Sequence, residues 1–225
     1  MLVLLEYKNP MLEILLIRHG QTDWNLNGRI MGYRPIPLNA VGRRQSEALR
    51  GVLGPLRLKA IYTSPILRAV ETARLMAKGR RVRILKAPEV REIEYGDWVG
   101  RTFEEVSKER NYRIYHTTPR HACAPGGERM TEVHKRVVGF IEKLRKRHRE
   151  GRIAVVSHAD VIKVILVHYL NLDLNELLRI RIDNGALSSL SFNGSQTRVL
   201  GVNCHPTLQN LFLRTDQNLP SPGKR

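Results

Sequence analysis

The chain has 225 residues, of which 42% are hydrophobic and 26% charged, the ordinary composition of a globular domain with one sizeable core. Its 17 glycines and 11 prolines are too few for a fibrous or low-complexity chain. Apolar runs also stay short of the roughly 18–20 residues that cross a bilayer. Fibrous, largely disordered and membrane-spanning classes of protein are thereby excluded.

The net charge is +17, because 38 Lys and Arg side chains face only 21 Asp and Glu. Much of the excess lies in Lys78–Lys86 and Lys143–Arg152, and such a surface attracts anions. A solvated basic face is the simpler interpretation, because aromatic residues are scarce and the sequence has no motif that reads a nucleic-acid groove. Contact with nucleic acid or another polyanion stays open as the second interpretation.

Cysteine usage and the first residues bear on the compartment. Cys123 and Cys204 lack the spacing of a zinc knuckle or a disulfide framework, which suits a reducing cytosol. Met1–Leu5 is apolar, but Glu6 and Lys8 interrupt it before a signal sequence could form. We therefore expect a cytoplasmic protein.

The expected elements alternate between strands and helices. Continuous apolar runs predict strands covered on both faces, and apolar residues at helical spacing predict helices. The predicted strands are Leu12–Ile17, Ala60–Thr63, Val82–Leu85, Ile153–Val156, Leu187–Phe192 and Thr197–Val202. The predicted helices are Asn39–Val52, Ser64–Ala77, Thr102–Arg110, Glu128–Arg147 and Ala159–Leu170. This alternation predicts an α/β fold with a mainly parallel sheet.

The expected domain organisation is a single domain over residues 12–206. Residues 88–126 are predicted to be a cap insertion over the edge of the sheet, because strand and helix patterns weaken there. Residues 1–11 are predicted to be an N-terminal extension, and residues 207–225 a C-terminal tail.

Polar residues suited to phosphate chemistry follow three of the predicted strands. His19, Ser64 and His158 each come at or just after a strand end, and ligands of such sheets bind at the carboxyl ends of the strands. Arg18 precedes the first histidine, and Arg68 follows the second strand. Guanidinium groups and helix N-termini favour phosphate oxygens, so these residues predict a phosphate receptor.

The same residues suggest a reaction. One neutral histidine nitrogen can attack phosphorus while the arginines and the second histidine neutralise the phosphoryl oxygens. The leaving alkoxide requires an acid, for which Glu92 and Glu94 are the candidates. Such chemistry needs neither a metal nor a cofactor, and the sequence has no Walker, GxGxxG or HExxH motif.

The segment Leu16–Asn25, with the sequence LIRHGQTDWN, resembles the signature of the histidine phosphatase superfamily, in its phosphoglycerate-mutase-like branch. Five further segments follow in the family's order and extend the resemblance over residues 12–195. They are Pro37–Gln45, Thr63–Ala73, Glu92–Trp98, Pro125–Glu128 and Val156–His158. The pattern is most similar to broad-specificity phosphatases and α-ribazole phosphatases.

The resemblance implies a three-layer sandwich, with helices on both faces of the sheet and a small inserted cap. It also implies a phosphohistidine at His19, with Arg18, Arg68 and His158 completing the catalytic pocket and Glu92 as the acid.

Four more residues are expected to bind substrate. Asn25 aligns with a phosphate ligand of the family, and Gln21 and Thr22 lie on the same loop. Ala159 completes the set and stands where the family more often has glycine.

The expected function is a metal-independent phosphatase for a small phosphorylated metabolite. A phosphoglycerate mutase, which returns the phosphoryl group to its bound product, is the alternative. A third hypothesis is a non-catalytic regulator that binds phosphate or a polyanion. No membrane partner is expected, and a homodimer is compatible with the sequence.

Overall fold

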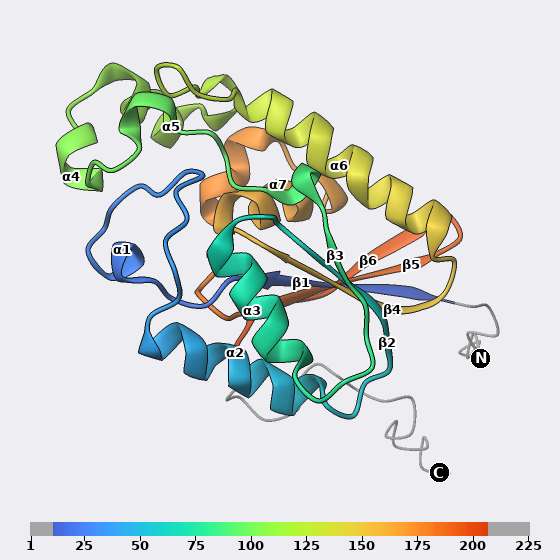
Figure 1. Ribbon diagram of the computed structural model, residues 1–225. Helices are drawn as coiled ribbons and strands as arrows, with labels where there is room; N and C mark the ends of the chain where they lie inside the picture. Colours follow the sequence, from blue (N-terminus) through green and yellow to red (C-terminus); the bar gives the residue numbers. More distant parts are fainter. Residues whose placement is uncertain (1–10, 207–225) are drawn as a thin grey trace, which may run out of the picture.

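The computed structural model of the chain describes residues 11–206. The predicted tail and all but the last residue of the predicted N-terminal extension lie outside the described residues. One six-stranded sheet, in the order β3-β2-β4-β1-β5-β6, forms the centre of the fold (Figure 1). The strands are β1 (Leu12–Arg18), β2 (Leu58–Thr63), β3 (Ile84–Lys86), β4 (Gly151–Ser157), β5 (Leu187–Asn193) and β6 (Gln196–Cys204). The first four run parallel, whereas β5 is antiparallel to β1, and β6 to β5. The predicted α/β class is confirmed.

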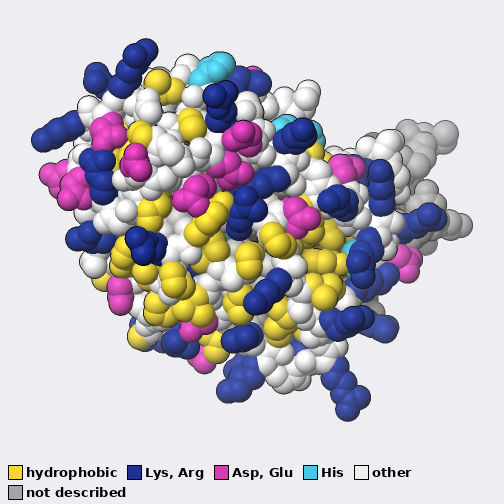
Figure 2. Space-filling view, turned by 45° about the horizontal axis from the view of Figure 1, so that its top comes forward, with side chains coloured by type: hydrophobic (Ala, Val, Ile, Leu, Met, Phe, Trp, Pro, Cys, Tyr) yellow, Lys and Arg dark blue, Asp and Glu magenta, His cyan; other side chains and the backbone are white. Residues whose placement is uncertain are grey.

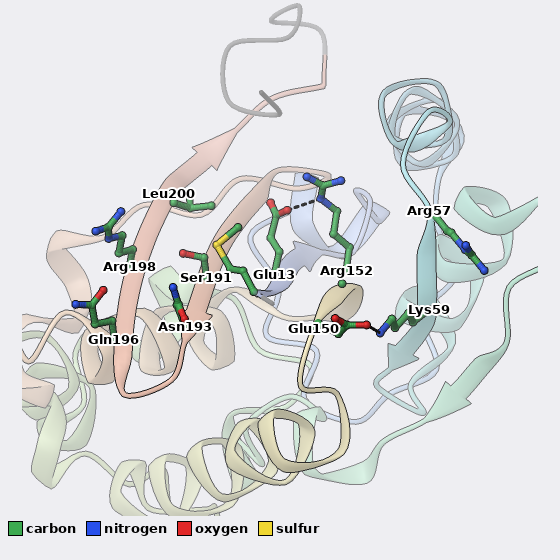
Figure 3. A pocket seen from close by; sticks show the side chains of 12 residues that line it. Glu13, Arg57, Lys59, Glu150, Arg152, Ser191, Asn193, Gln196, Arg198 and Leu200 are labelled. Atoms are coloured by element: carbon green, nitrogen blue, oxygen red, sulfur yellow. Dashed lines mark hydrogen bonds and ion pairs between the residues drawn. The ribbon is translucent and has the colours of Figure 1, made fainter. Parts of the chain in front are cut away.

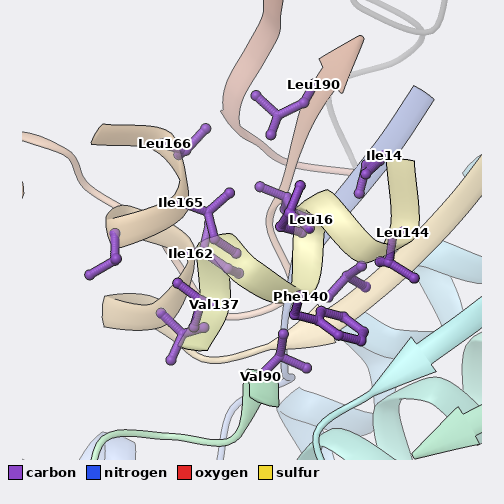
Figure 4. Close-up of a cluster of buried hydrophobic side chains, with 14 of the residues drawn as sticks. Ile14, Leu16, Val90, Val137, Phe140, Leu144, Ile162, Ile165, Leu166 and Leu190 are labelled. Atoms are coloured by element: carbon purple, nitrogen blue, oxygen red, sulfur yellow. The ribbon is translucent and has the colours of Figure 1, made fainter. Parts of the chain in front are cut away.

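Helices cover both faces of the sheet, as the resemblance implied. In Figure 1, α2 (Ala40–Leu53) and α3 (Leu67–Ala77) lie on one face, and α6 (Met130–Arg147) and α7 (Ala159–Tyr169) on the other. Side chains alternate along a strand, so β1 supplies both cores. Its Leu15 and Ile17 pack toward α2 and α3. Ile14 and Leu16 pack on α6 and α7, among side chains such as Phe140 and Ile165 (Figure 4).

The segment between β3 and α6 forms a cap beside the N-terminal end of α6 (Figure 1). Its short helices are η1 (Pro88–Val90), η2 (Gly96–Trp98), α4 (Phe103–Val106), α5 (Arg110–Thr117) and η3 (Pro119–His121). The single helix predicted over Thr102–Arg110 is wrong, because the structure has α4 and α5 there. A capping box between Thr102 and Glu105 starts α4. Glu109 is the N-cap residue of the separate helix α5, and its carboxylate binds Trp98 and Arg101 rather than the first turn of that helix.

Two helices begin later than predicted. The Ser64-Pro65 pair was expected to open α3, but the helix begins at Leu67, after an N-cap residue that makes no side-chain bond. The Ser64 hydroxyl instead bonds His158. Glu128 was expected inside α6, but that helix begins at Met130. The Glu128 carboxylate lies before the helix and pairs with Arg136 in its second turn. The other short elements are α1 (Asp23–Leu26) and η4 (Leu174–Arg179).

Basic side chains are spread over the surface. Figure 2 shows Lys and Arg distributed across one face, with Asp and Glu among them rather than in a separate region. Within residues 11–206, none of the helices combines the length and apolarity needed to cross a membrane.

Candidate active site

Three chain segments leave the sheet side by side at the carboxyl ends of β1, β2 and β4. The backbone N–H of His19 donates to Ser157 O at 3.0 Å, and that of Ser64 donates to Val156 O at 2.9 Å. Sheet hydrogen bonding therefore continues one residue past the strands. The ring centroids of His19 and His158 come to lie 5.1 Å apart, so two residues separated by most of the chain share one site.

Gly20 brings the loop after His19 against the start of α2. A Cβ atom on Gly20 would lie 2.4 Å from Gly42 O, and one on Gly42 would lie 2.1 Å from Gln21 O. Thr72 on α3 adds a side-chain oxygen that accepts from Gly20 N at 3.0 Å. Only glycine allows this close approach, which fixes the backbone that carries His19.

The hydrogen bonds of His19 define its tautomer. Nδ1 lies 2.7 Å from Gly20 O, which can only accept, so Nδ1 carries the proton. Nε2 receives the Arg68 Nε–H at 3.1 Å, and a guanidinium can only donate. Burial and the charges of Arg68 and Arg18 keep the pKa of His19 well below its ordinary value. Nε2 is therefore unprotonated, and its electron pair accepts the Arg68 N–H until a phosphorus atom takes the place of that donor.

Two guanidinium groups act on His19: Arg68 donates to Nε2, and the charge of Arg18 also lowers the pKa of the ring. Arg68 is fully buried, donates to Gly32 O and Arg34 O at 3.0 and 3.2 Å, and lies 3.9 Å from Glu92 Oε2. Desolvation lowers its pKa to about 10, so it stays cationic at neutral pH. Arg18 donates through Nη1 to the carbonyl of Ile182, whereas its buried Nε has no hydrogen-bond partner among the described residues. Unused donors of this kind suit the oxygens of a phosphoryl group.

His158 faces the centre with a second unused nitrogen. Its Nε2 lies 2.8 Å from Ser64 Oγ, and that hydroxyl also accepts from Ile66 N. Its Nδ1 is buried without a hydrogen-bond partner in the described structure, 3.7 Å from Glu92 Oε2. Burial and the charge of Arg68 hold the pKa of His158 well below its ordinary value. Nδ1 is thus placed to donate to, or accept from, a group that enters the centre.

Glu92 is the carboxyl group of the centre. It is 8% exposed, and Oε1 accepts from Ile93 N at 3.0 Å. Burial and the negative charge of Asp160 raise its pKa to about 7, against the opposing effect of Arg68. A carboxyl of this kind can give and take a proton near neutral pH. Glu94, the other candidate acid, does not line the cavity described next.

A cavity of about 660 Å³ opens above these groups, between the sheet edge and the cap. Among the expected site residues, Arg18, Asn25, Glu92 and Ala159 line it, whereas His19, Arg68 and His158 are not among its lining residues; the cap adds aromatic side chains. The other aromatic and basic lining residues include Arg29, Trp98, Phe103, Tyr112, His116 and Arg181. The cavity can therefore hold a phosphate ester whose organic part contacts the cap.

Gln21 and Thr22 lie in the loop rather than in the cavity lining. The backbone N–H of Gln21 donates to Gln45 Oε1 at 2.9 Å. Thr22 is fully buried and forms a capping box with Asn25 at the start of α1. Their contacts hold the loop in place, and their binding of substrate stays a prediction.

Some residues of the centre are missing from the sequence-based prediction. Asn184 donates from Nδ2 to His19 O and to Asn25 Oδ1, both at 3.2 Å, but it comes from a loop without a recognisable motif. Asp160 is a buried acid that accepts from Tyr95 and Tyr115. Its signal was available, because a charged residue in the otherwise apolar first turn of α7 calls for a partner.

A second hollow, of about 810 Å³, lies at the opposite end of the strands, where β1, β2 and β4 begin (Figure 3). Two of its cations face carboxylates: Arg152 points to Glu13, and Lys59 lies 3.4 Å from Glu150. None of the predicted site residues lines this hollow, whereas Arg18, Asn25, Glu92 and Ala159 line the cavity beside the cap. Residues 11–206 also contain no group of three or more His, Cys, Asp or Glu side chains able to hold a metal ion. Cys123 and Cys204 are both free thiols.

Comparison with known proteins points the same way. Residues 14–205 match the family model described as "Histidine phosphatase superfamily (branch 1)". Phosphoserine phosphatase 1 of Hydrogenobacter thermophilus is 31% identical over 199 residues, covering 87% of this chain and 94% of that protein. Adenosylcobalamin/alpha-ribazole phosphatase of Escherichia coli is 30% identical over 184 residues, covering 81% and 91%. The crystal structure of an alpha-ribazole phosphatase from Shigella flexneri is similar with a TM-score of 0.78 and 28% identity, covering 85% of this chain and 96% of that one.

Proposed function

Because the chain belongs to the histidine phosphatase superfamily, branch 1, we propose that it hydrolyses small phosphate monoesters through a phosphohistidine at His19, without a metal ion. The family match and the phosphatases among the relatives confirm the predicted superfamily and the predicted class of enzyme. The observation that carries the proposed mechanism is the unprotonated Nε2 of His19, which faces the guanidinium of Arg68.

In the first step, His19 Nε2 attacks phosphorus and the bond between phosphorus and the alcohol oxygen breaks. Arg18, Arg68 and His158 stabilise the phosphoryl oxygens through the donors that surround the centre. Glu92, protonated below about pH 7, gives its proton to the leaving alkoxide. The products are a phosphohistidine, an alcohol and the Glu92 carboxylate.

In the second step, the Glu92 carboxylate removes a proton from a water molecule that attacks phosphorus. The bond between phosphorus and His19 Nε2 breaks, inorganic phosphate leaves, and Glu92 is protonated again. Each group thus returns to its starting state, so the cycle consumes only ester and water.

The substrate is a small phosphorylated metabolite. A cavity of about 660 Å³ supports this size, and its aromatic and basic lining supports an organic part with polar or anionic groups. The names of the relatives point to phosphoserine and alpha-ribazole phosphate as the first compounds to try.

The experiment that tests the proposal is phosphate release from p-nitrophenyl phosphate in EDTA, by the wild type and by His19→Ala. The exposed His121, on η3, supplies the matched control His121→Ala. We expect the wild type and the control to release phosphate and His19→Ala to release none. Mass spectrometry of wild-type enzyme quenched at alkaline pH, where phosphohistidine is stable, should find a phosphorylated His19 peptide. Near-normal release by His19→Ala, or strong inhibition by EDTA, would contradict the proposal.

3-Phosphoglycerate, run alongside, separates the other hypotheses. Conversion to the 2-isomer without phosphate release would identify a mutase. The absence of turnover with this compound, the aryl ester, phosphoserine and alpha-ribazole phosphate would favour the phosphate-binding regulator.

A further inference from the structure

Asp160 is a buried carboxylate, 8% exposed, whose hydrogen bonds come from three parts of the fold. The hydroxyl of Tyr95, in the loop before η2, donates to Oδ2 at 2.6 Å. The hydroxyl of Tyr115, on cap helix α5, donates to the same oxygen at 2.5 Å. Lys163, one turn along α7, donates to Oδ1 at 3.0 Å. The network ties the cap to the helix that follows His158.

Every partner of Asp160 is a donor, which favours its ionised form. Burial alone would raise its pKa, but Lys163 and the two tyrosine hydroxyls outweigh burial and lower it. Both tyrosines stay protonated, because burial and the charge of Asp160 raise the pKa of each well above its ordinary value. Asp160 is therefore a fixed negative charge whose oxygens are already engaged.

Asp160 and Glu92 line the same cavity, and Asp160 comes two residues after His158, whose Nδ1 lies 3.7 Å from Glu92 Oε2. At this position the charge of Asp160 raises the pKa of Glu92. A nearby like charge favours the protonated form of a carboxyl group. Arg68 at 3.9 Å and the charge of Arg18 oppose this effect, and Lys163 offsets part of the charge of Asp160. Asp183 is a second carboxylate in the lining of the cavity and is paired with Arg181. The titratable and charged groups around Glu92 and Asp160 are Arg18, Arg68, Tyr95, Tyr115, His158 and Lys163.

We propose that Asp160 is a positioning residue whose fixed charge, held by Tyr95, Tyr115 and Lys163, keeps the Glu92 carboxyl protonated. Glu92 can then give this proton to the leaving alkoxide. The inference rests on the proposed function, in which Glu92 is the acid. The cap takes part in this arrangement, because Tyr115 on α5 donates a hydrogen bond that keeps Asp160 ionised and in place. Neutralising Asp160 without changing its size would leave Glu92 ionised at a lower pH.

The direct test is a ¹³C NMR titration of the Glu92 carboxyl, identified by the signal that Glu92→Gln removes. Asp160→Asn is expected to lower the midpoint by about one pH unit or more. The control is Asp97→Asn, because Asp97 is exposed and lies two residues from Tyr95; it should leave the midpoint unchanged. An unchanged midpoint in Asp160→Asn would overturn the inference, and this readout does not depend on turnover.

The kinetic test uses the pH profile of kcat/KM for an alkyl ester, β-glycerol phosphate. The alkaline limb reports loss of the Glu92 proton, so it should move to lower pH in Asp160→Asn and return in Asp160→Glu. The same limb should be weak with p-nitrophenyl phosphate, whose leaving group needs little protonation. A uniform loss of rate with no shift of the limb would mean a structural role and overturn the inference.

Two further controls keep the tests interpretable. Asp160→Asn leaves Lys163 without its partner, so the double variant with Lys163→Gln removes the pair together and should shift the midpoint in the same direction. Release by the wild type is measured first: its absence would contradict the proposed function, whereas the NMR titration would still decide the role of Asp160.

Discussion

Arg68 is the side chain whose replacement most directly tests the geometry of the centre. It donates to His19 Nε2, Gly32 O and Arg34 O, which uses all three of its nitrogens. Lysine keeps the charge but has one nitrogen, so Arg68→Lys cannot reproduce this fork. The nucleophile would lose its orienting donor, and a phosphoryl group would face a single ammonium in place of the planar guanidinium.

The size of the effect follows from the bonds that are lost. A hydrogen bond to a charged group contributes about 1.5–3 kcal/mol, so losing two of them costs about 3–6 kcal/mol. Because about 1.4 kcal/mol corresponds to a factor of ten in rate, we expect kcat/KM to fall roughly 10²–10⁴-fold. The retained positive charge should keep the variant above the activity of Arg68→Ala.

The assay is kcat/KM for p-nitrophenyl phosphate, together with urea unfolding to confirm that the variant is folded. Arg74→Lys is the matched control, because Arg74 lies on the same helix but is exposed. It should stay within about twofold of the wild type, since exposed substitutions rarely affect a site they do not touch. A fall of less than about fivefold in a folded Arg68→Lys variant would refute the proposed role of the fork.

Three other substitutions test separate parts of the site. Glu92→Gln should slow β-glycerol phosphate roughly 10²–10⁴-fold and p-nitrophenyl phosphate much less, as seen in kcat/KM; equal slowing would remove it from the acid role. Gly20→Ala should lower the free energy of unfolding in urea by about 1–3 kcal/mol and remove most of the activity, because its Cβ would meet Gly42 O. Gly139→Ala is the control and should not destabilise the protein, because the space around Gly139 is open. Asn184→Ala should lower kcat/KM roughly tenfold by releasing two hydrogen bonds, and an unchanged value would make this contact dispensable.

The parts of the fold that sequence predicted well are those with strong local signals. The continuous apolar run predicts strand β1, and the apolar residues at helical spacing predict helix α6, because each pattern matches the face or faces that the element buries in the core. The cap is different, because α4 and α5 are short and local contacts set where each begins. These contacts are the capping box of Thr102 with Glu105 at α4, and the bonds of Glu109 to Trp98 and Arg101 before α5. Such contacts decide an element of four to eight residues but leave little periodic pattern.

The site shows the same division. His19 and His158 could be placed together because both follow predicted strands of one sheet. Asn184 could not, because its position depends on the loop that precedes β5. The partners of Asp160 were hidden for a related reason: Tyr115 meets it only when the cap folds over the sheet. Residues that support a site from loops are fixed by tertiary contacts rather than by local pattern.

The position of β1 has a consequence for how the enzyme matures. β1 pairs with β4 on one side and β5 on the other, so its partners lie more than a hundred residues further along the chain. A chain leaving the ribosome therefore carries His19 long before it can complete the centre with His158. Contacts of such long sequence separation form slowly. Catalytic competence should accordingly be among the last properties gained in refolding, and its recovery should follow the joining of β1 to β4 rather than the formation of helices.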